Sequence, residues 1–208
     1  MIVDIIWHLL IGVVVSFAGS IPLGTINLGV VQTTVSVNLK AGLYFALGAT
    51  LIELIYSTIA IKLIGVLMTQ THLDSIIRMV SVPVFLLVAV YYLKKEEKEG
   101  ETKELRKGRS FLNGIFLGVI NPLQIPFWVF WGSIFMSNNW ISKDEFLLNV
   151  FIAGICIGTI LVLTLIAFLS HSIAAKVNLK SHFVNKLIGY VLIVLGVYQL
   201  FDLTYKFI

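Results

Sequence analysis

Glu53 is the residue of this chain whose chemistry stands out, because it is an acidic side chain in the middle of the long apolar segment 41–66. A carboxylate at membrane depth is costly unless it is paired, solvated or protonated, so it is a candidate to bind a proton or a cationic group. Tyr56, three residues further on, is predicted to hydrogen-bond to it. The helix face that carries Glu53 is predicted to turn toward other helices or a cavity, because its other residues are small or polar: Ala46, Ala49, Thr50, Ser57 and Ala60.

Two prolines interrupt apolar segments at equivalent positions, each beside polar residues: Pro22 in the first segment and Pro122 in the fourth. Proline in a helix interior removes a backbone hydrogen bond, and in a bilayer the freed groups must be bonded by protein or by water in a cavity. A simple kink is the alternative interpretation. The N–H groups that begin the second half of a broken helix attract anions such as a carboxylate. We therefore predict a site for substrate and protons made of Glu53, Pro22, Gly24, Asn27, Tyr56, Asn121, Pro122 and Gln124.

The composition predicts that helices crossing a membrane carry these residues. Hydrophobic residues make up 58% of the 208 residues and charged residues 12%, and the mean hydropathy is +0.97. A helical span needs about 20 apolar residues. Six segments qualify, so we expect an all-α integral membrane protein, with residues 1–208 forming one membrane domain and no soluble catalytic domain. The predicted spans are 5–32, 41–66, 76–93, 111–136, 146–169 and 185–205.

The two halves of the chain carry proline breaks and a similar short motif in the same order. The proline breaks fall in the first and fourth spans. Ala89-Val90-Tyr91-Tyr92-Leu93 at the end of the third span resembles Gly196-Val197-Tyr198-Gln199-Leu200 in the sixth. Three spans in each half require the second half to be inverted relative to the first. We predict two inverted three-helix repeats, about 1–93 and 111–208, with broken helices at the first and fourth spans. Inverted repeats of this kind are typical of secondary transporters, whose binding site lies near the midplane.

The basic residues predict the orientation. Seven of the fifteen Lys and Arg residues lie in the polar stretch 94–109, together with five glutamates. The positive-inside rule places the linker 94–110 in the cytoplasm and both termini outside, in a multi-pass protein of the cell (inner) membrane. The net charge of +4 is not grouped with aromatic residues on one soluble face, so we expect a lipid bilayer and no nucleic acid as partner. A homo-oligomer is left open.

Other patterns concern packing and the remaining function classes. Gly114 with Gly118 and Gly154 with Gly158 predict close helix contacts. Trp128 is a candidate to line a pathway.

One cysteine excludes an internal disulfide and a Cys-x-x-Cys pair, and no metalloprotease or serine-hydrolase motif is present, so we expect neither an enzyme nor a cofactor. A divalent-metal or other cation permease is less favoured, since no span has paired acidic or histidine residues. A non-transporting membrane assembly protein stays open.

These residues together resemble the LysE/RhtB family of amino-acid exporters over essentially the whole chain. Pro22 matches the first proline of the family's Pro-Gly-Pro motif, Glu53 its acidic residue, and Asn121-Pro122 its Asn-Pro pair. Leu23 and Gly24 depart from the motif, where the family has glycine and the second proline. The resemblance implies secondary active export of amino acids or similar small solutes by proton antiport. The other matching residues are Gly42, Gly48, Phe111, Gly114, Gly189 and Gly196.

Overall fold

The computed structural model describes residues 1–21, 24–67, 108–121 and 124–173, together with the single residues 83, 90, 94 and 190. Six helices and no strand lie in these ranges, in agreement with the predicted all-α class. Pro22, Pro122 and, apart from single residues, the predicted spans 76–93 and 185–205 lie outside the described residues.

The first predicted span is made of two separate helices. Helix α1 covers Ile2–Ser20 and α2 covers Thr25–Ser36. Gly24, the N-cap of α2, is extended, with φ −82° and ψ −178°, and its carbonyl accepts the first intrahelical bond, from the N–H of Leu28. Helix α3 follows at Leu39–Leu67, and the side chain of Asn38 caps it by accepting from the N–H of Ala41 at 2.8 Å.

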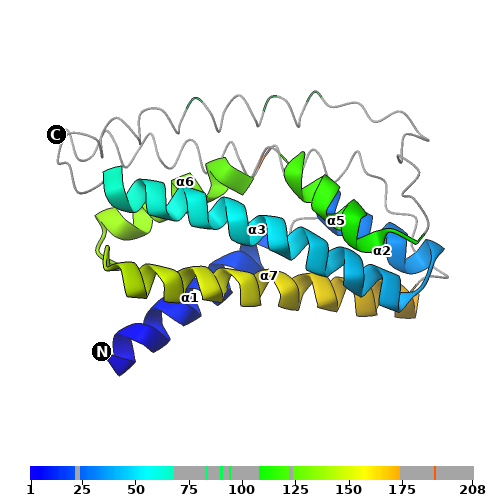
Figure 1. The fold of residues 1–208 in the computed structure, drawn as a ribbon, viewed down its shortest axis with the longest axis horizontal. Coiled ribbons are helices and arrows are strands. Elements are labelled where there is room, and N and C mark those ends of the chain that lie inside the picture. The colour runs from blue at the N-terminus through cyan, green and yellow to red at the C-terminus, as the bar shows by residue number, and fades with distance from the viewer. Residues whose placement is uncertain are drawn as a thin grey trace.

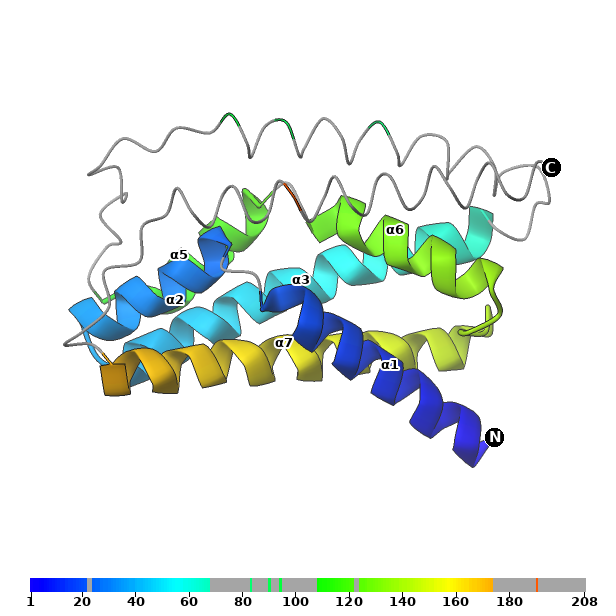
Figure 2. The same ribbon diagram turned by 180° about the vertical axis from the view of Figure 1, so that it is seen from behind.

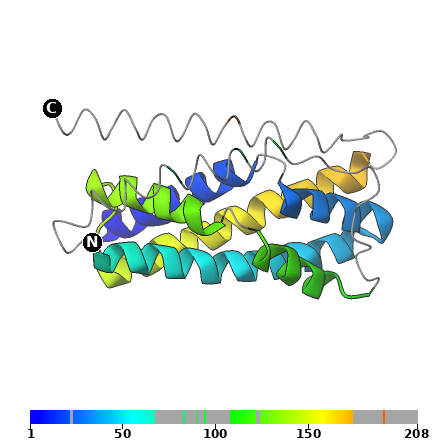
Figure 3. The same cartoon turned by 90° about the horizontal axis from the view of Figure 1, so that it is seen from above.

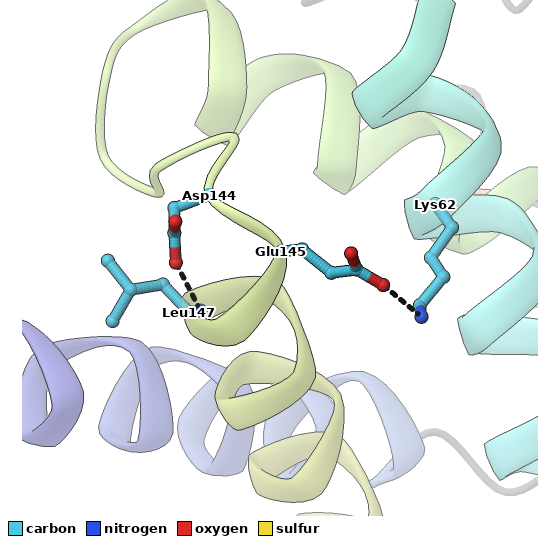
Figure 4. Close-up of polar contacts among 4 residues, drawn as sticks. All are labelled: Lys62, Asp144, Glu145 and Leu147. Carbon is cyan, nitrogen blue, oxygen red and sulfur yellow. Dashed lines mark hydrogen bonds and ion pairs between the residues drawn. The ribbon is translucent and has the colours of Figure 1, made fainter.

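The second half begins with the same arrangement. Helix α5 covers Ser110–Val119 and α6 covers Gln124–Ser137, and the pair is bent by 62°. Pro126 is the third residue of α6, where its missing N–H costs no intrahelical bond. Helix α7 then covers Glu145–Ile173. The carboxylate of Asp144 accepts from the N–H of Leu147 and caps α7, while Glu145 pairs with Lys62 of α3 at 3.3 Å (Figure 4).

Within the described ranges, three helices are long and apolar enough to cross a membrane: Ile2–Ser20, Leu39–Val66 and Glu145–Ser172. The bent pair α5 and α6 is a fourth span if it counts as one. At 29 residues, α3 and α7 are each about 43 Å long, which exceeds the ~30 Å hydrocarbon core of a bilayer. The protein is therefore a multi-pass membrane protein.

Helices α3 and α7 run side by side along the long axis, and the shorter helices pack around them (Figures 1 and 2). Helix α1 packs on α7, and α5 packs on α3. Helices α2 and α5 lie at one end of the molecule and α6 lies at the other (Figure 3). The interrupted helices thus place their breaks toward the middle of the long axis.

Two of these contacts are close because glycine stands at the crossing. A Cβ on Gly154 or Gly158 of α7 would meet backbone carbonyl oxygens of α1, and a Cβ on Gly114 of α5 would meet the carbonyl oxygen of Phe45 on α3. A Cβ on Gly118 would meet the Ile52 side chain. The close helix contacts predicted from these glycines are confirmed.

The apolar core is divided into two clusters. One contains Ala60, Ile61 and Ile64 of α3, the buried aromatic residues of α6 and residues 148–155 of α7. The other contains Phe45, Ala46 and Ala49 of α3, Val30 of α2 and residues 162–167 of α7. The clusters are separated by residues 50–59 on α3, about three turns, and by residues 156–161 on α7, a little under two turns. Glu53 lies in the stretch of α3.

Candidate functional site

The carboxylate of Glu53 is held by two donors from the start of α6. Nε2 of Gln124 donates to Oε2 at 2.5 Å, and the indole Nε1 of Trp128 donates to Oε1. The two donors lie four residues apart and so share one face of α6. Gln124 and Trp128 are almost completely buried, whereas Glu53 is partly buried. Each carboxylate oxygen therefore has one neutral N–H partner.

No cation of the described residues balances the charge of Glu53. The ion pairs found there join the N-terminal ammonium to Asp4 and Lys62 to Glu145, both with exposed carboxylates. Hydrogen bonds from neutral donors favour an ionised carboxylate but leave its charge in place. Within the described residues the carboxylate of Glu53 therefore has hydrogen-bond donors but no counter-ion.

Side chains bond the last carbonyl of each interrupted helix. Nδ2 of Asn27 donates to the carbonyl of Ser20, the last residue of α1, at 2.6 Å. The hydroxyl of Tyr56 donates to the carbonyl of Val119, the last residue of α5, at 3.0 Å. A helix end has carbonyls without intrahelical donors, which need partners when water is excluded. Asn27 and Tyr56 thus stabilise the ends of the helices beside the two breaks.

This arrangement corrects one expectation. Tyr56 was expected to bond to Glu53, but its only proton is donated to Val119. The physical reason is that both oxygens of Glu53 already have donors from α6, while the carbonyl at the end of α5 has no donor within its helix.

The structure brings Glu53 and Gln124 into direct contact, and the other predicted site residues lie at the breaks. Gly24 begins α2, and Asn27 is buried one turn later. The N–H of Asn121 bonds to the carbonyl of Gly118 at 3.2 Å, just after α5. Pro22 and Pro122 are outside the described residues.

Trp128 is a site residue that the sequence pattern does not assign to Glu53. The sequence predicts only that Trp128 lines a pathway. The available signal was the four-residue step from Gln124 to Trp128, which puts two donors on one face of a helix. A buried indole N–H needs an acceptor, and few acceptors other than a carboxylate exist in such an apolar surrounding.

Among the described residues, the side-chain amide of Gln124 has a hydrogen-bond partner for its nitrogen but not for its oxygen. Its Nε2 is bonded to Glu53, but its Oε1 is buried and no donor among the described residues reaches it. Most buried polar atoms in proteins have a partner, so a carbonyl oxygen without one beside a carboxylate calls for an explanation.

As for metal ligands, no group of three or more His, Cys, Asp or Glu side chains in the described part of the chain is arranged to hold a metal ion. The charge of Glu53 also acts on Cys156 of α7.

Comparison with known proteins gives one match. The family model described as LysE type translocator matches residues 17–203, which include both breaks, Glu53 and its two donors. No curated protein and no solved structure matches the chain.

Proposed function

Since the chain belongs to the LysE type translocator family, we propose that it exports amino acids or similar small solutes across the cell (inner) membrane in exchange for protons. The family is one of transporters and not of enzymes. The multi-pass helical architecture agrees with transport across a bilayer.

The observation that carries this proposal is the carboxylate of Glu53, which lies between two apolar clusters and has only neutral donors among the described residues. A proton and a substrate ammonium group each neutralise this charge, and one carboxylate cannot accommodate both. Burial opposes ionisation of a carboxylate, whereas a nearby ammonium group favours it. Competition for one carboxylate couples the two movements of an antiporter, because binding of a proton releases the cationic substrate.

The start of α6 supports a substrate that also carries a carboxylate. The first N–H groups of this 14-residue helix have no intrahelical acceptors and no acidic residue in the first turn. They lie next to Gln124, which contacts Glu53. An ammonium group on Glu53 and a carboxylate at the α6 N-terminus are the two ends of an amino acid.

For alternating access we propose that residues 1–93 and 111–208 form two inverted repeats joined by a cytoplasmic linker, 94–110. The contacts support this division, because α1 packs on α7 as α5 packs on α3. Under the repeat, α1 corresponds to α5 and α3 to α7. Inverted repeats move against each other around a fixed site, and the helix ends held by Asn27 and Tyr56 are close to where that movement occurs.

The test is an efflux panel with loaded cells, comparing amino acids, dipeptides and divalent cations with and without the protein. Glu53→Gln keeps the shape of the side chain and removes its charge, so export should be lost while the protein still folds. The matched control is Glu145→Gln, which removes an exposed carboxylate that pairs with Lys62 and not with the donors of Glu53 (Figure 4). Export at the wild-type rate with unchanged pH dependence in Glu53→Gln, or movement of divalent cations alone, would overturn the proposal.

A further inference from the structure

We propose that Gln124 is the proton-positioning residue of this site: its amide donates N–H to ionised Glu53 and then turns over to accept the O–H of protonated Glu53. The inference rests on the proposed function, because it concerns the same carboxylate. It explains the buried Oε1 of Gln124, which no donor among the described residues reaches.

The first step is to decide which oxygen takes the proton. The indole of Trp128 has an N–H and no acceptor, so it can only donate. In a protonated carboxyl group, one oxygen remains a carbonyl that accepts and the other becomes an O–H that donates. Oε1 keeps its bond from Trp128 as the carbonyl oxygen, and the proton therefore goes to Oε2, which faces Gln124.

The second step follows from the chemistry of the amide. With the proton on Oε2, the N–H of Gln124 and the new O–H would be two donors facing each other. A glutamine amide has nearly the same shape after a half turn about its last bond, and that turn exchanges its NH₂ group for its carbonyl oxygen. The turn presents Oε1 to the O–H of Glu53. No hydrogen bond to Oε1 has to be broken, since no donor among the described residues reaches it.

The other groups around Glu53 do not take this role. The proton of Tyr56 on α3 is committed to the carbonyl of Val119. Cys156 on α7 is affected by the charge of Glu53, but a thiol sulfur is a weak acceptor. Neither described ion pair includes the site, so no charged side chain of these helices competes for the proton.

Two variants test these steps. Gln124→Met keeps the length of the side chain and removes both the N–H and the carbonyl oxygen. Trp128→Phe tests the choice of oxygen, because it removes the donor that keeps Oε1 unprotonated and leaves the amide of Gln124 intact. Both positions are buried, so each variant replaces a polar contact by an apolar side chain in a similar setting.

The measurement is an infrared difference spectrum, acid minus alkaline, of purified protein labelled with ¹³C at the glutamine amide carbonyl. We expect one labelled amide band to move to lower wavenumber on acidification, because that carbonyl gains a hydrogen bond. The band should move in the wild type. It should be stationary in Trp128→Phe, because Oε1 without its indole donor can take the proton while Gln124 keeps donating to Oε2. The band should be absent in Gln124→Met, which assigns it, and stationary in Glu53→Gln, which has no carboxyl proton to donate.

The two ways of failing are distinct. If the carboxyl band of Glu53 appears on acidification but no labelled glutamine band moves, the role of Gln124 is wrong and the proposed function stands. If no carboxyl band depends on Glu53 at any pH, proton exchange at this residue is wrong as well. In export assays, Gln124→Met should lower proton-driven export by a factor of roughly 10 to 150, the range for one hydrogen bond to a charged group.

Discussion

Replacing Gly154 by alanine tests the helix crossing that the whole arrangement depends on. A Cβ at this position would meet the carbonyl oxygen of Leu9, and it would lie 3.1 Å from both the Cα of Gly12 and the N of Val13. All three are backbone atoms of α1, so none can swing aside as a side chain would. Helices α1 and α7 must therefore move apart to accept the methyl group.

The cost follows from two contributions. Overpacking a close contact typically costs about 1–3 kcal/mol. The crossing also carries a buried hydrogen bond of 2.7 Å between Ser16 of α1 and Thr159 of α7. Moving the helices apart weakens this bond, whose net value is about 0.5–1.5 kcal/mol. We expect Gly154→Ala to lower the free energy of unfolding by about 1.5–4.5 kcal/mol.

The assay is equilibrium unfolding of purified protein in mixed micelles with increasing SDS, followed by circular dichroism. Gly65→Ala is the control, because a Cβ on this buried helical glycine meets only the ends of the Leu148 and Met136 side chains, at 3.2 and 3.9 Å. It carries the same gain in helix propensity without the backbone clash.

The result that refutes the reasoning is equal stability of the two variants, which would mean that α1 and α7 do not cross at this glycine. The double variant Gly12→Ala with Gly154→Ala adds a further check. The two methyl groups enter the same contact, so the two losses should not add.

Three further predictions concern the ends of the helices. Tyr56→Phe leaves the last carbonyl of α5 without its donor and should lower the free energy of unfolding by about 1–3 kcal/mol in the same assay; an unchanged value would show that another donor serves this carbonyl. His8 accepts from the N–H of Ser142 at 2.8 Å, so His8→Phe should speed hydrogen exchange at that amide, and equal exchange would contradict the bond. Lys62→Met breaks an exposed ion pair with Glu145 and should change stability by no more than about 1 kcal/mol, whereas a larger loss would mean that the pair is shielded from water.

Features that depend only on residues close together along the chain could be predicted from the sequence. Hydropathy summed over a segment predicts a membrane helix, because the bilayer imposes the same requirement on each span. The helix ends beside residues 22 and 122 follow from the missing N–H of proline, which acts on its own turn. Glu53 could be identified as a candidate to bind a proton or a cationic group. The free-energy cost of a carboxylate in an apolar segment can be judged without knowing which residues contact it.

The contacts made by Glu53 could not be predicted in this way. Gln124 and Trp128 lie 71 and 75 positions away along the chain, and they meet the carboxylate only through the register of α3 against α6. Tyr56 shows the limit of local reasoning, since its partner is not the residue three positions away but one 63 positions away.

The sequence by itself determined that the chain is helical, crosses a membrane and carries one acidic group inside an apolar segment, since local composition sets each of these properties. Only the tertiary structure decided which donors hold that group, which amide oxygen has no partner among the described residues, and that Glu53 lies between the two apolar clusters. The physical reason is that packing of distant helices, through glycines such as Gly114 and Gly154, sets these contacts. A single-residue shift along either helix would replace every one of them.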